Sequence, residues 1–361
     1  MQIYFNDNFK SLLLSLDLVK SIGQINEYKG KIDVYHKTYP GIFKELQKST
    51  KIKYIETQIK THPKTKIVNK RIQQLIRSEV FPKTKIEDEI FCYNEVLSLI
   101  HDNHKKLKLS SEFISELHFQ LFKYHSSDSG RWRQKDLIIP NSPMITFFLH
   151  AYKFKPHVEI QSSINQLCNE YNVWDKDNHL EPITSICNFI LTLAYIIPFD
   201  FGNIKLARLL FHLFLLQKGH IFIKYICLDN FIQKYEREYL NAFYKSSANL
   251  YDKEHNITFW LEVLVKIILE AYEELVNYIE ISCSKNCKIQ RIRDFINRHE
   301  GAFTKEIIRQ KNPDIGESTI NRALKSLQNQ GNIQLVCRGR TAQWMKIPAN
   351  HIALKRTDAE L

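Results

Sequence analysis

The feature that constrains this chain most is an apolar segment near its middle. Residues 182–199 read PITSICNFILTLAYIIPF and contain no charged side chain. A helix that is apolar on almost every side must be buried, so this segment predicts a central core helix. The sequence stays helical in character from Glu181 to about Ile281, and a long helix with an acidic solvent face starts near Asn256. Only ten Gly and ten Pro occur among 361 residues, which favours helices throughout.

The N-terminal third also has helical patterns. Residues 1–105 are expected to form helices with some extended pieces, and Glu87–Asp102 is amphipathic. A further helix follows in SSEFISELHFQLFKYH, with Ser110 or Ser111 as its N-cap. A turn of Ser, Asp and Gly comes next, and DLII, from Asp136, is expected to be a short strand. These patterns predict a mainly α protein with one short strand in this region.

The last part of the chain predicts a separate unit. RIRDFINRH is expected to be a short helix, FTKEIIRQ a second with Thr304 as N-cap, and GESTINRALKSLQNQG a third that Ser318 caps and Gly331 ends. NIQLVCRGRTAQWMKI then reads as two strands joined by a basic turn. This order is that of a winged helix-turn-helix. We therefore expect an N-terminal helical region at 1–105, a core at 106–284, a winged-helix domain at 285–350 and a tail at 351–361.

Positive charge is concentrated in this C-terminal part. The net charge is +12, and residues 285–361 hold fifteen Lys and Arg against seven Asp and Glu, a net of +8. A localised basic segment indicates a polyanion partner such as DNA. The residues expected to contact DNA lie on the third helix and at the basic turn: Thr319, Asn321, Arg322, Lys325, Arg338 and Arg340. The alternative is a protein-docking module with a solvated basic face. Tight DNA binding would require a homodimer that reads two half-sites.

Cysteine usage and hydropathy bear on the compartment. Seven scattered Cys, an odd number, favour free thiols in a reducing compartment. Cys283 and Cys287 form the one close pair and lack a second pair of ligands, so no metal site is expected. The N-terminus does not have the pattern of a signal peptide, and no segment offers about 18 uninterrupted apolar residues. We expect a cytoplasmic protein without membrane contact.

The main candidate for a site is Ile196–Gln217, IIPFDFGNIKLARLLFHLFLLQ. Its start is typical of a phosphate-binding loop that runs into a helix, where backbone amides attract anions. Gly202 and Asn203 lie at the turn, and Lys205 and Arg208 follow on one side of the first helical turns. Asn203 can donate to a phosphate, and the two basic residues add charge. These four residues are the predicted nucleotide-binding set. The alternative is an ordinary helix start with solvated basic residues.

The order of these segments resembles the Fic-domain family over most of residues 110–280. The family motif is His-Pro-Phe-x-(Asp/Glu)-Gly-Asn-Gly-(Arg/Lys)-x-x-Arg. Ile197 stands for the His, Phe201 for the acid and Ile204 for the second Gly, whereas the other positions match: Pro198, Phe199, Gly202, Asn203, Lys205 and Arg208. GRWR, at Gly130–Arg133, resembles the family's Gly-x-x-Arg element before its flap strand, so the resemblance implies a Fic-like helical core with a short β-hairpin flap. Several Fic proteins also carry a C-terminal winged helix.

The resemblance implies transfer of AMP from ATP to a protein hydroxyl. In the family the His deprotonates that hydroxyl, the acid holds the metal, and the loop and the Arg grip the phosphates. Ile197 cannot accept a proton, and Phe201 cannot bind Mg²⁺, which prefers oxygen ligands. Ile204 adds bulk where Gly lets the backbone approach phosphate. We therefore expect no catalytic residue and no metal here, and ATP is the one cofactor that the resemblance suggests.

The resemblance also implies an inhibitory helix upstream of the core. Many Fic proteins carry a (Ser/Thr)-x-x-x-Glu-(Gly/Asn) motif whose Glu pairs with the last motif Arg. The best match is TKIVNK, Thr65–Lys70, with Asn69 at the Glu position, so the inhibitory contact would be absent. Glu87 and Glu89 are rival candidates. The scattered histidines, including His118, are expected to have no functional role. His212 is expected to be buried or capping, and its alternative is a place near the cleft.

Our leading interpretation is a catalytically degenerate Fic-family protein that acts as a DNA-binding or partner-binding regulator. The alternative is an active nucleotidyl (AMP) or phosphate transferase that acts on a protein hydroxyl. That activity would require a compensating His or carboxylate in the cleft. A scaffold in which both sites are only structural is a third interpretation.

Overall fold

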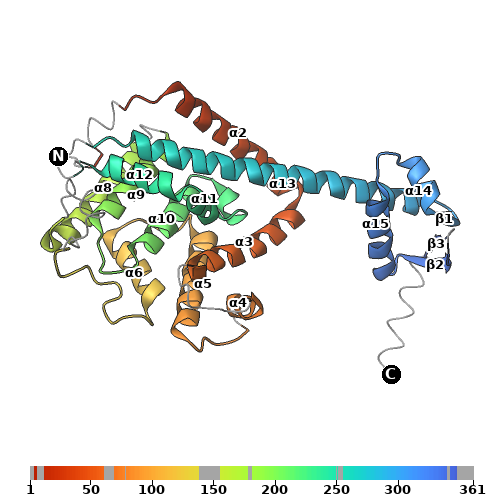
Figure 1. Cartoon of the computed structure of the whole chain (residues 1–361), viewed down its shortest axis with the longest axis horizontal. Coiled ribbons are helices and arrows are strands. Elements are labelled where there is room, and N and C mark those ends of the chain that lie inside the picture. The colour runs from red at the N-terminus through yellow and green to blue at the C-terminus, as the bar shows by residue number, and fades with distance from the viewer. Residues whose placement is uncertain are drawn as a thin grey trace. The chain divides into compact units, whose positions relative to one another are not determined.

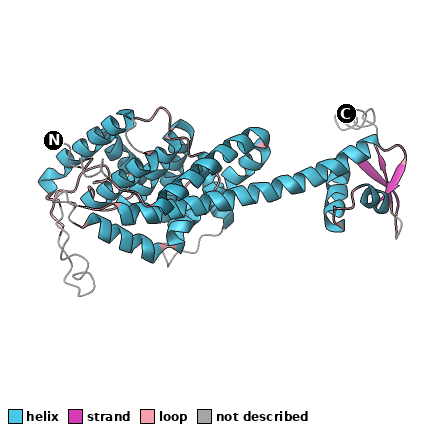
Figure 2. Cartoon of the chain, turned by 90° about the horizontal axis from the view of Figure 1, so that it is seen from above, coloured by secondary structure: helices cyan, strands magenta, loops and turns pink. Residues whose placement is uncertain are grey.

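A computed structural model of the chain describes residues 4–5, 12–60, 69–77, 79–137, 155–177, 181–248, 250, 255–339 and 342–347. The chain divides into two compact units, Met1–Val276 and Asn277–Leu361. Helices dominate, and the described strands form one small sheet in the second unit (Figure 2). The predicted mainly α class is confirmed. Among the described residues, no helix combines the length and the apolar character that a membrane crossing requires.

The first unit is a helical assembly (Figure 1). Its elements in chain order are α2 (Leu16–Thr38), α3 (Pro40–Lys60), α4 (Asn69–Ile76), α5 (Lys85–Asn103), α6 (Ser111–Phe122), η1 (His157–Glu159), α8 (Ile160–Asp177), α9 (Pro182–Ile196), α10 (Asn203–Gln217), η2 (Ile221–Lys224), α11 (Leu228–Lys234), α12 (Glu236–Ser247) and the first part of α13 (Thr258–Arg298). Helix α9 packs against α8, α10 and α12, and α10 also contacts α5 and α6.

The buried helix predicted from the sequence is α9, and nearly all of its side chains are buried. Pro182 suits the first helical turn because its φ is fixed near the helical value. The Glu181 carboxylate accepts hydrogen bonds from two backbone N–H groups of that turn. The Trp260 indole of α13 donates to the Cys187 carbonyl oxygen at 3.0 Å. Helix α9 leads directly into residues 197–202, the motif loop. The burial of α9 therefore anchors one side of the candidate site.

Two more predicted helices are α5 and α6. The Ser110 hydroxyl accepts a hydrogen bond from the Phe113 backbone N at 3.1 Å, so Ser110 rather than Ser111 is the N-cap. Asp136 and Leu137, the start of the expected flap strand, belong to no strand. The rest of that expectation, residues 138–154, lies outside the described residues.

The second unit combines the end of α13 with β1 (Ala302–Thr304), α14 (Lys305–Lys311), α15 (Glu317–Asn329), β2 (Ile333–Cys337) and β3 (Gln343–Lys346). The strands pair antiparallel in the order β1-β3-β2, with Trp344 opposite both Phe303 and Leu335. One core joins helices and sheet, and it includes Ile320, Leu324 and Leu327, the apolar stripe expected on the third helix.

Three features of this unit differ from the sequence expectation. Helix α13 runs unbroken to Arg298, so RIRDFINRH is its last part and not a separate helix. Residues 281–291 contain neither Gly nor Pro that would end it. Helix α15 starts after Gly316, which already has the extended N-cap conformation, so the expected cap at Ser318 is wrong. Strand β1 was not expected, because three residues are too few for a pattern. Thr304 is confirmed as the cap of α14, and Gly331, at φ 71°, follows α15 as expected.

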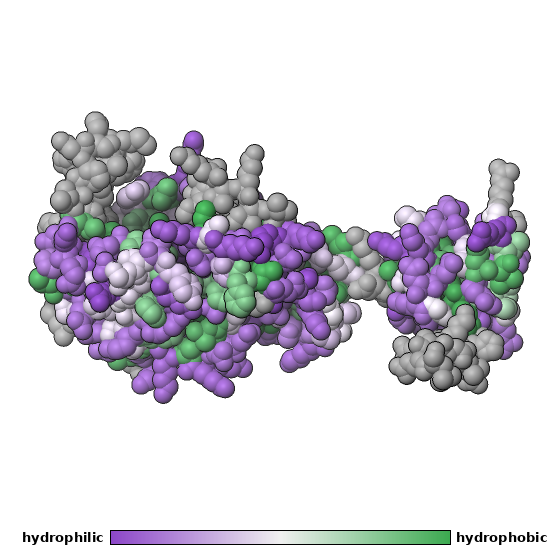
Figure 3. Space-filling model, turned by 90° about the horizontal axis from the view of Figure 1, so that it is seen from below, coloured by the Kyte–Doolittle hydropathy of each residue, from purple (hydrophilic) through white to green (hydrophobic). Residues whose placement is uncertain are grey.

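Hydrophilic side chains cover most of the face drawn in Figure 3, and apolar ones are scattered among them. Single exposed apolar residues are normal on protein surfaces. One of them bears on the candidate site, because Ile204, at the start of α10, is 70% exposed. Its bulk therefore faces solvent beside the motif loop and does not fill the core.

Candidate functional site

The candidate site is the loop of residues 197–202 between α9 and α10. Ile197 closes α9 at φ 49° and ψ 68°, a left-handed conformation that is rare for a β-branched residue. Asn203 ties the loop together. Its Oδ1 accepts a hydrogen bond from the Phe199 backbone N at 3.0 Å, and its Nδ2 donates to the Phe199 carbonyl oxygen at 2.8 Å. The side-chain amide of Asn203 was predicted to donate to a phosphate, but it is bonded to the loop backbone.

Gly202 is the N-cap of α10 and has φ 75°. A Cβ built at this position would lie 2.3 Å from Cε2 of Phe122 in α6. Both the backbone conformation and the lack of space therefore require Gly. The loop backbone lies directly against the aromatic ring of Phe122.

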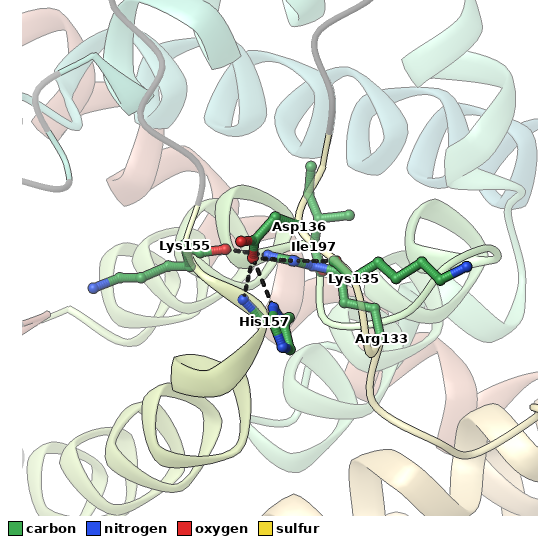
Figure 4. Close-up of polar contacts among 6 residues, drawn as sticks. All are labelled: Arg133, Lys135, Asp136, Lys155, His157 and Ile197. Carbon is green, nitrogen blue, oxygen red and sulfur yellow. Dashed lines mark hydrogen bonds and ion pairs between the residues drawn. The ribbon is translucent and has the colours of Figure 1, made fainter.

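Arg133 joins the motif loop to the chain on both sides of residues 138–154 (Figure 4). It is 1% exposed. Its backbone N donates to the Pro198 carbonyl oxygen and its Nε to the Ile197 carbonyl oxygen, both at 2.9 Å. Nη1 donates to the Lys135 carbonyl oxygen at 2.9 Å, and Nη2 to that of Lys155. Only the planar guanidinium fork reaches several carbonyls at once. Burial lowers the pKa of Arg133.

Asp136 and His157 connect the same two chain segments (Figure 4). Asp136 Oδ1 accepts a hydrogen bond from the His157 backbone N at 2.6 Å and lies 3.0 Å from His157 Nδ1. These hydrogen bonds lower the pKa of the Asp136 carboxyl. The pair lies at the entry to α8 and so belongs to the framework around the loop.

His118 of α6 lies under the loop, and both of its ring nitrogens are engaged. Nδ1 accepts a hydrogen bond from the Gly130 backbone N at 2.9 Å, so Nε2 carries the proton and donates to the Phe201 carbonyl oxygen at 3.0 Å. The ring stacks on Phe199 with a centroid distance of 3.8 Å. Burial lowers the pKa of His118 to about 4. This histidine is buried, and it is held neutral with no nitrogen available to a substrate.

Phe201 lies among aromatic rings. Its ring centroid is 5.2 Å from that of Phe122, at an interplanar angle of 87°, and 5.1 Å from the rings of both His118 and His125. Edge-to-face and tilted pairs at such distances are favourable. At the position where the resemblance places a metal-binding acid, the chain therefore has a ring packed against three others.

Lys205 and Arg208 lie on α10 as expected, and each lies beside a carboxylate. Lys205 Nζ is 2.9 Å from Oε2 of Glu89 in α5. Arg208 Nη1 is 3.8 Å from Oδ2 of Asp229 in α11. Asp229 is 1% exposed, and its Oδ2 also accepts a hydrogen bond from Gln58 Nε2 at 3.0 Å. Burial raises the pKa of Asp229, whereas Arg208 and Gln58 oppose that shift. The predicted basic pair is thus matched by two acids.

A cavity of about 20 Å³ lies beside Lys205, between α3, α5, α6 and α10. Gln58, Glu89, Tyr93 and Phe122 contribute to its lining. A buried water needs roughly 10–15 Å³, so this space suits one water and is too small for a phosphate group.

The residues proposed for inhibition are only partly described. Asn69 is the first residue of α4, but its side chain and residues 65–68 lie outside the described residues. Of the rival acids, Glu87 pairs with Arg71 at 2.8 Å. Glu89 reaches the motif helix but pairs with Lys205, not with Arg208.

The candidate DNA-binding residues lie in the second unit. Asn321, Arg322 and Lys325 are exposed on α15, where they line a shallow surface depression, and Thr319 is half-buried. Arg338 is exposed after β2. Arg340 lies outside the described residues.

Sequence reasoning missed Asp229. Its signal was an acid within the otherwise apolar run YICLDNFI, a placement that usually requires a buried partner. The partner, Arg208, is 21 residues earlier in the chain, and spacing alone does not connect the two.

Comparisons with known proteins bear on the fold and on the family of the first unit's core. The chain is similar to the crystal structure of a Fic family protein from Desulfovibrio desulfuricans G20, at 14% identity and a TM-score of 0.59, over 93% of this chain and 97% of that one. It is also similar to a Fic domain containing signaling protein from Bacteroides thetaiotaomicron VPI-5482, at 16% identity and a TM-score of 0.54, over 72% and 98% of the two chains. Fic-1 from C. elegans gives 15% identity and a TM-score of 0.53, over 73% of each chain.

No curated protein sequence matches the chain. At such low identities the solved structures establish the fold alone. The model of the Fic/DOC family matches residues 108–215, which include α6, the motif loop and most of α10. The chain therefore contains a Fic/DOC family domain at residues 108–215, within a fold that resembles Fic structures.

Proposed function

We propose that this chain is a catalytically degenerate Fic protein that acts as a DNA-binding regulator. The proposed lack of catalysis rests on one observation: Phe201 packs against three aromatic rings at the position of the metal-binding acid. Mg²⁺ takes oxygen ligands, and a phenyl ring supplies none. The residues present do not fit the metal that the resemblance implies.

The position of the family's general base holds no base either. Ile197 has an aliphatic side chain, and its carbonyl oxygen is bonded to Arg133. His118, the histidine beneath the loop, has both nitrogens in hydrogen bonds. A protein hydroxyl is a weak nucleophile without a nearby base, and loss of such a base typically costs about 10²–10⁴ in rate.

Two further observations fit a site without transfer chemistry. Asn203 is bonded to the loop backbone, and Ile204 projects into solvent where a Gly would let phosphate approach. Gly202, Asn203, Lys205 and Arg208 remain the residues that an anion would meet if it entered. Asp200 is exposed within the loop and is the residue to test if transfer does occur.

The regulator half rests on the second unit. We infer that it is a winged helix whose α15 enters a DNA groove, because Asn321, Arg322 and Lys325 are exposed opposite a buried stripe. A net charge of +8 over residues 285–361 supports a polyanion partner. Docking of an acidic protein on the same face is the competing outcome of a DNA titration.

Label transfer from ATP tests the catalytic half. The full chain, incubated with α-labelled ATP, Mg²⁺ and a cell lysate, is expected to leave no label on any protein. Ile197→His alone should also give none, because Phe201 would still exclude the metal. Label that survives denaturation would contradict the proposal, and its loss in Asp200→Asn would then identify the compensating carboxylate.

A further inference from the structure

We propose that Asp229 and Glu89 determine the ligand selectivity of the motif site, because they are built-in anions that pair with Arg208 and Lys205 and exclude phosphate compounds. This inference rests on the proposed function and deepens it, since it adds that a site without transfer chemistry also excludes nucleotide. It concerns the two basic residues that match the family motif, and it does not depend on the residues that depart from it.

The Arg208–Asp229 pair carries the argument furthest. The Asp229 carboxylate is 1% exposed, and the Arg208 side chain is 24% exposed. The acid therefore lies on the protein side of the guanidinium, at 3.8 Å, while part of Arg208 reaches solvent. Gln58 fixes the carboxylate from α3 with a hydrogen bond of 3.0 Å. A phosphate that approached Arg208 from solvent would meet a guanidinium already neutralised from inside.

Lys205 is paired in a similar way. Its ammonium is 2.9 Å from Glu89, and the two side chains are 23% and 18% exposed. His125 Nδ1 lies 3.6 Å from the other Glu89 oxygen. Both basic residues on the first turns of α10 therefore have an acid from a different helix beside them. A carboxylate held in place by the fold has no association entropy to lose, so it competes well with a free anion.

The buried side of the two ion pairs offers little space for a phosphate. Among the described residues, Asp229 Oδ1, Arg208 Nε and Tyr93 Oη are buried without a hydrogen-bond partner. Buried polar atoms of this kind commonly bond to an internal water. The cavity of about 20 Å³ beside Lys205 is lined by Gln58, Glu89 and Tyr93, and not by Arg208 or Asp229. It has space for one water and is too small for a phosphate.

The charge of Asp229 should depend on pH. The groups that act on it are Arg208, Gln58, Tyr54, Tyr93, Cys227 and Tyr239. Burial raises the pKa of the Asp229 carboxyl, so protonation as the pH falls would remove the internal anion. Exclusion of phosphate compounds is then expected to weaken in acid.

Calorimetric titration of the full chain with inorganic pyrophosphate and with ATP tests this inference. Wild type, Asp229→Asn, Glu89→Gln and the double variant are compared. Asn keeps an oxygen that can accept the Gln58 hydrogen bond, so it removes charge with little change in shape. The matched control is Glu238→Gln, which removes an acid from an ion pair with Lys266 elsewhere in the first unit.

We expect no pyrophosphate binding by wild type at millimolar concentration. Asp229→Asn and the double variant should bind pyrophosphate. Their Kd should be at least about tenfold below the highest concentration at which wild type shows no binding, since removal of a charge at about 4 Å leaves Arg208 unpaired. Glu238→Gln should behave as wild type. Circular dichroism establishes that each variant is folded.

Two results would overturn the inference: wild type that binds pyrophosphate as tightly as the double variant, or a folded double variant that does not bind it. Pyrophosphate carries no adenosine, so its binding reports on the phosphate side of the site alone. Failure of the proposed function is a separate result, because label transfer by wild type would contradict it whatever the variants bind.

Discussion

Nε2 of His118 lies 3.0 Å from the carbonyl oxygen of Phe201, so a histidine of α6 is bonded to the backbone of the motif loop. The same ring stacks on Phe199 and contacts the ring of Phe201. His118 therefore supports a loop whose side chains pack instead of holding a metal. Substitutions in the loop should therefore change the stability of the protein, and unfolding experiments can measure that change.

Replacement of Phe201 should reveal that packing. Phe201→Ala is expected to lower the free energy of unfolding by about 1–3 kcal/mol, because a half-buried ring loses its neighbours. Phe201→Asp should cost more, since the carboxylate would lie among three rings. Urea unfolding followed by circular dichroism measures both, with Phe119→Ala, 43% exposed on α6, as the control. A Phe201→Asp variant as stable as wild type would mean that the loop has room for a metal-binding acid.

Gly202→Ala tests the contact between the loop and α6. Its Cβ would lie 2.3 Å from Phe122, and the backbone is at φ 75°, so we expect a loss of about 2–4 kcal/mol from strain and overlap together. Gly219→Ala in the same unit has φ 81° but meets only the flexible end of Lys29, so it should lose about 1 kcal/mol from backbone strain. Equal losses would show that Phe122 moves aside easily.

The sequence predicted much of this fold, for identifiable reasons. A segment without charge from Pro182 to Phe199 admits only a buried helix, and α9 is that helix. The Gly202-Asn203 turn and the basic residues after it located the motif loop. The Arg208–Asp229 pair could not be predicted from spacing, because Asp229 comes 21 residues after Arg208 on another helix. Glu89, 116 residues before Lys205, was a candidate partner of Arg208, but it pairs with Lys205. Both ion pairs are set by tertiary packing. No spacing in the sequence indicates that the Asn203 side chain bonds to the Phe199 backbone.

Arg133→Lys should destabilise the first unit although it keeps the charge. Lysine has one ammonium group and cannot serve the carbonyl oxygens of Ile197, Lys135 and Lys155 together. A buried carbonyl left without a donor costs about 1–3 kcal/mol, and these three are only partly buried, so a total loss of about 2–4 kcal/mol is expected. Thermal unfolding measures it, with Arg131→Lys, an exposed neighbour, as the control. Equal melting temperatures for Arg133→Lys and wild type would mean that these hydrogen bonds contribute little.

Buried histidines predict loss of stability in acid. Burial lowers the pKa of His118 to about 4 and that of His212 to about 3, from an ordinary value of about 6.5. Between these values the unfolded chain binds more protons than the folded chain. The contribution of these histidines to the free energy of unfolding is therefore complete above pH 6.5 and is lost as the pH drops toward 4. The urea midpoint at pH 5 should lie below that at pH 7.5.

His212→Leu should flatten this pH dependence, because it removes one buried titrating ring whose Nδ1 has no partner among the described residues. His36→Leu, on an exposed part of α2, is the control and should leave the dependence unchanged. An identical pH profile for His212→Leu and wild type would assign the acid sensitivity to other groups.

DNA binding by the second unit should depend steeply on salt, because phosphate contacts by Lys and Arg release counterions. Arg338→Ala combined with Arg340→Ala should weaken binding to every sequence and reduce the slope of log K against log salt by about 1–2, since a wing mainly contacts phosphates. Arg322→Ala or Asn321→Ala should instead relax sequence preference, at about 1–3 kcal/mol for a bidentate base contact.

Fluorescence anisotropy with random and genomic duplexes at two salt concentrations separates these effects. Lys20→Ala, exposed on α2 in the first unit, is the control and should change neither affinity nor slope. If the full chain does not bind duplex DNA at low salt, or if the Arg338/Arg340 variant binds as wild type does, α15 is not a DNA-reading helix. The exposed basic face of Asn321, Arg322 and Lys325 would then fit an acidic protein surface, for which Arg322→Ala should still weaken binding.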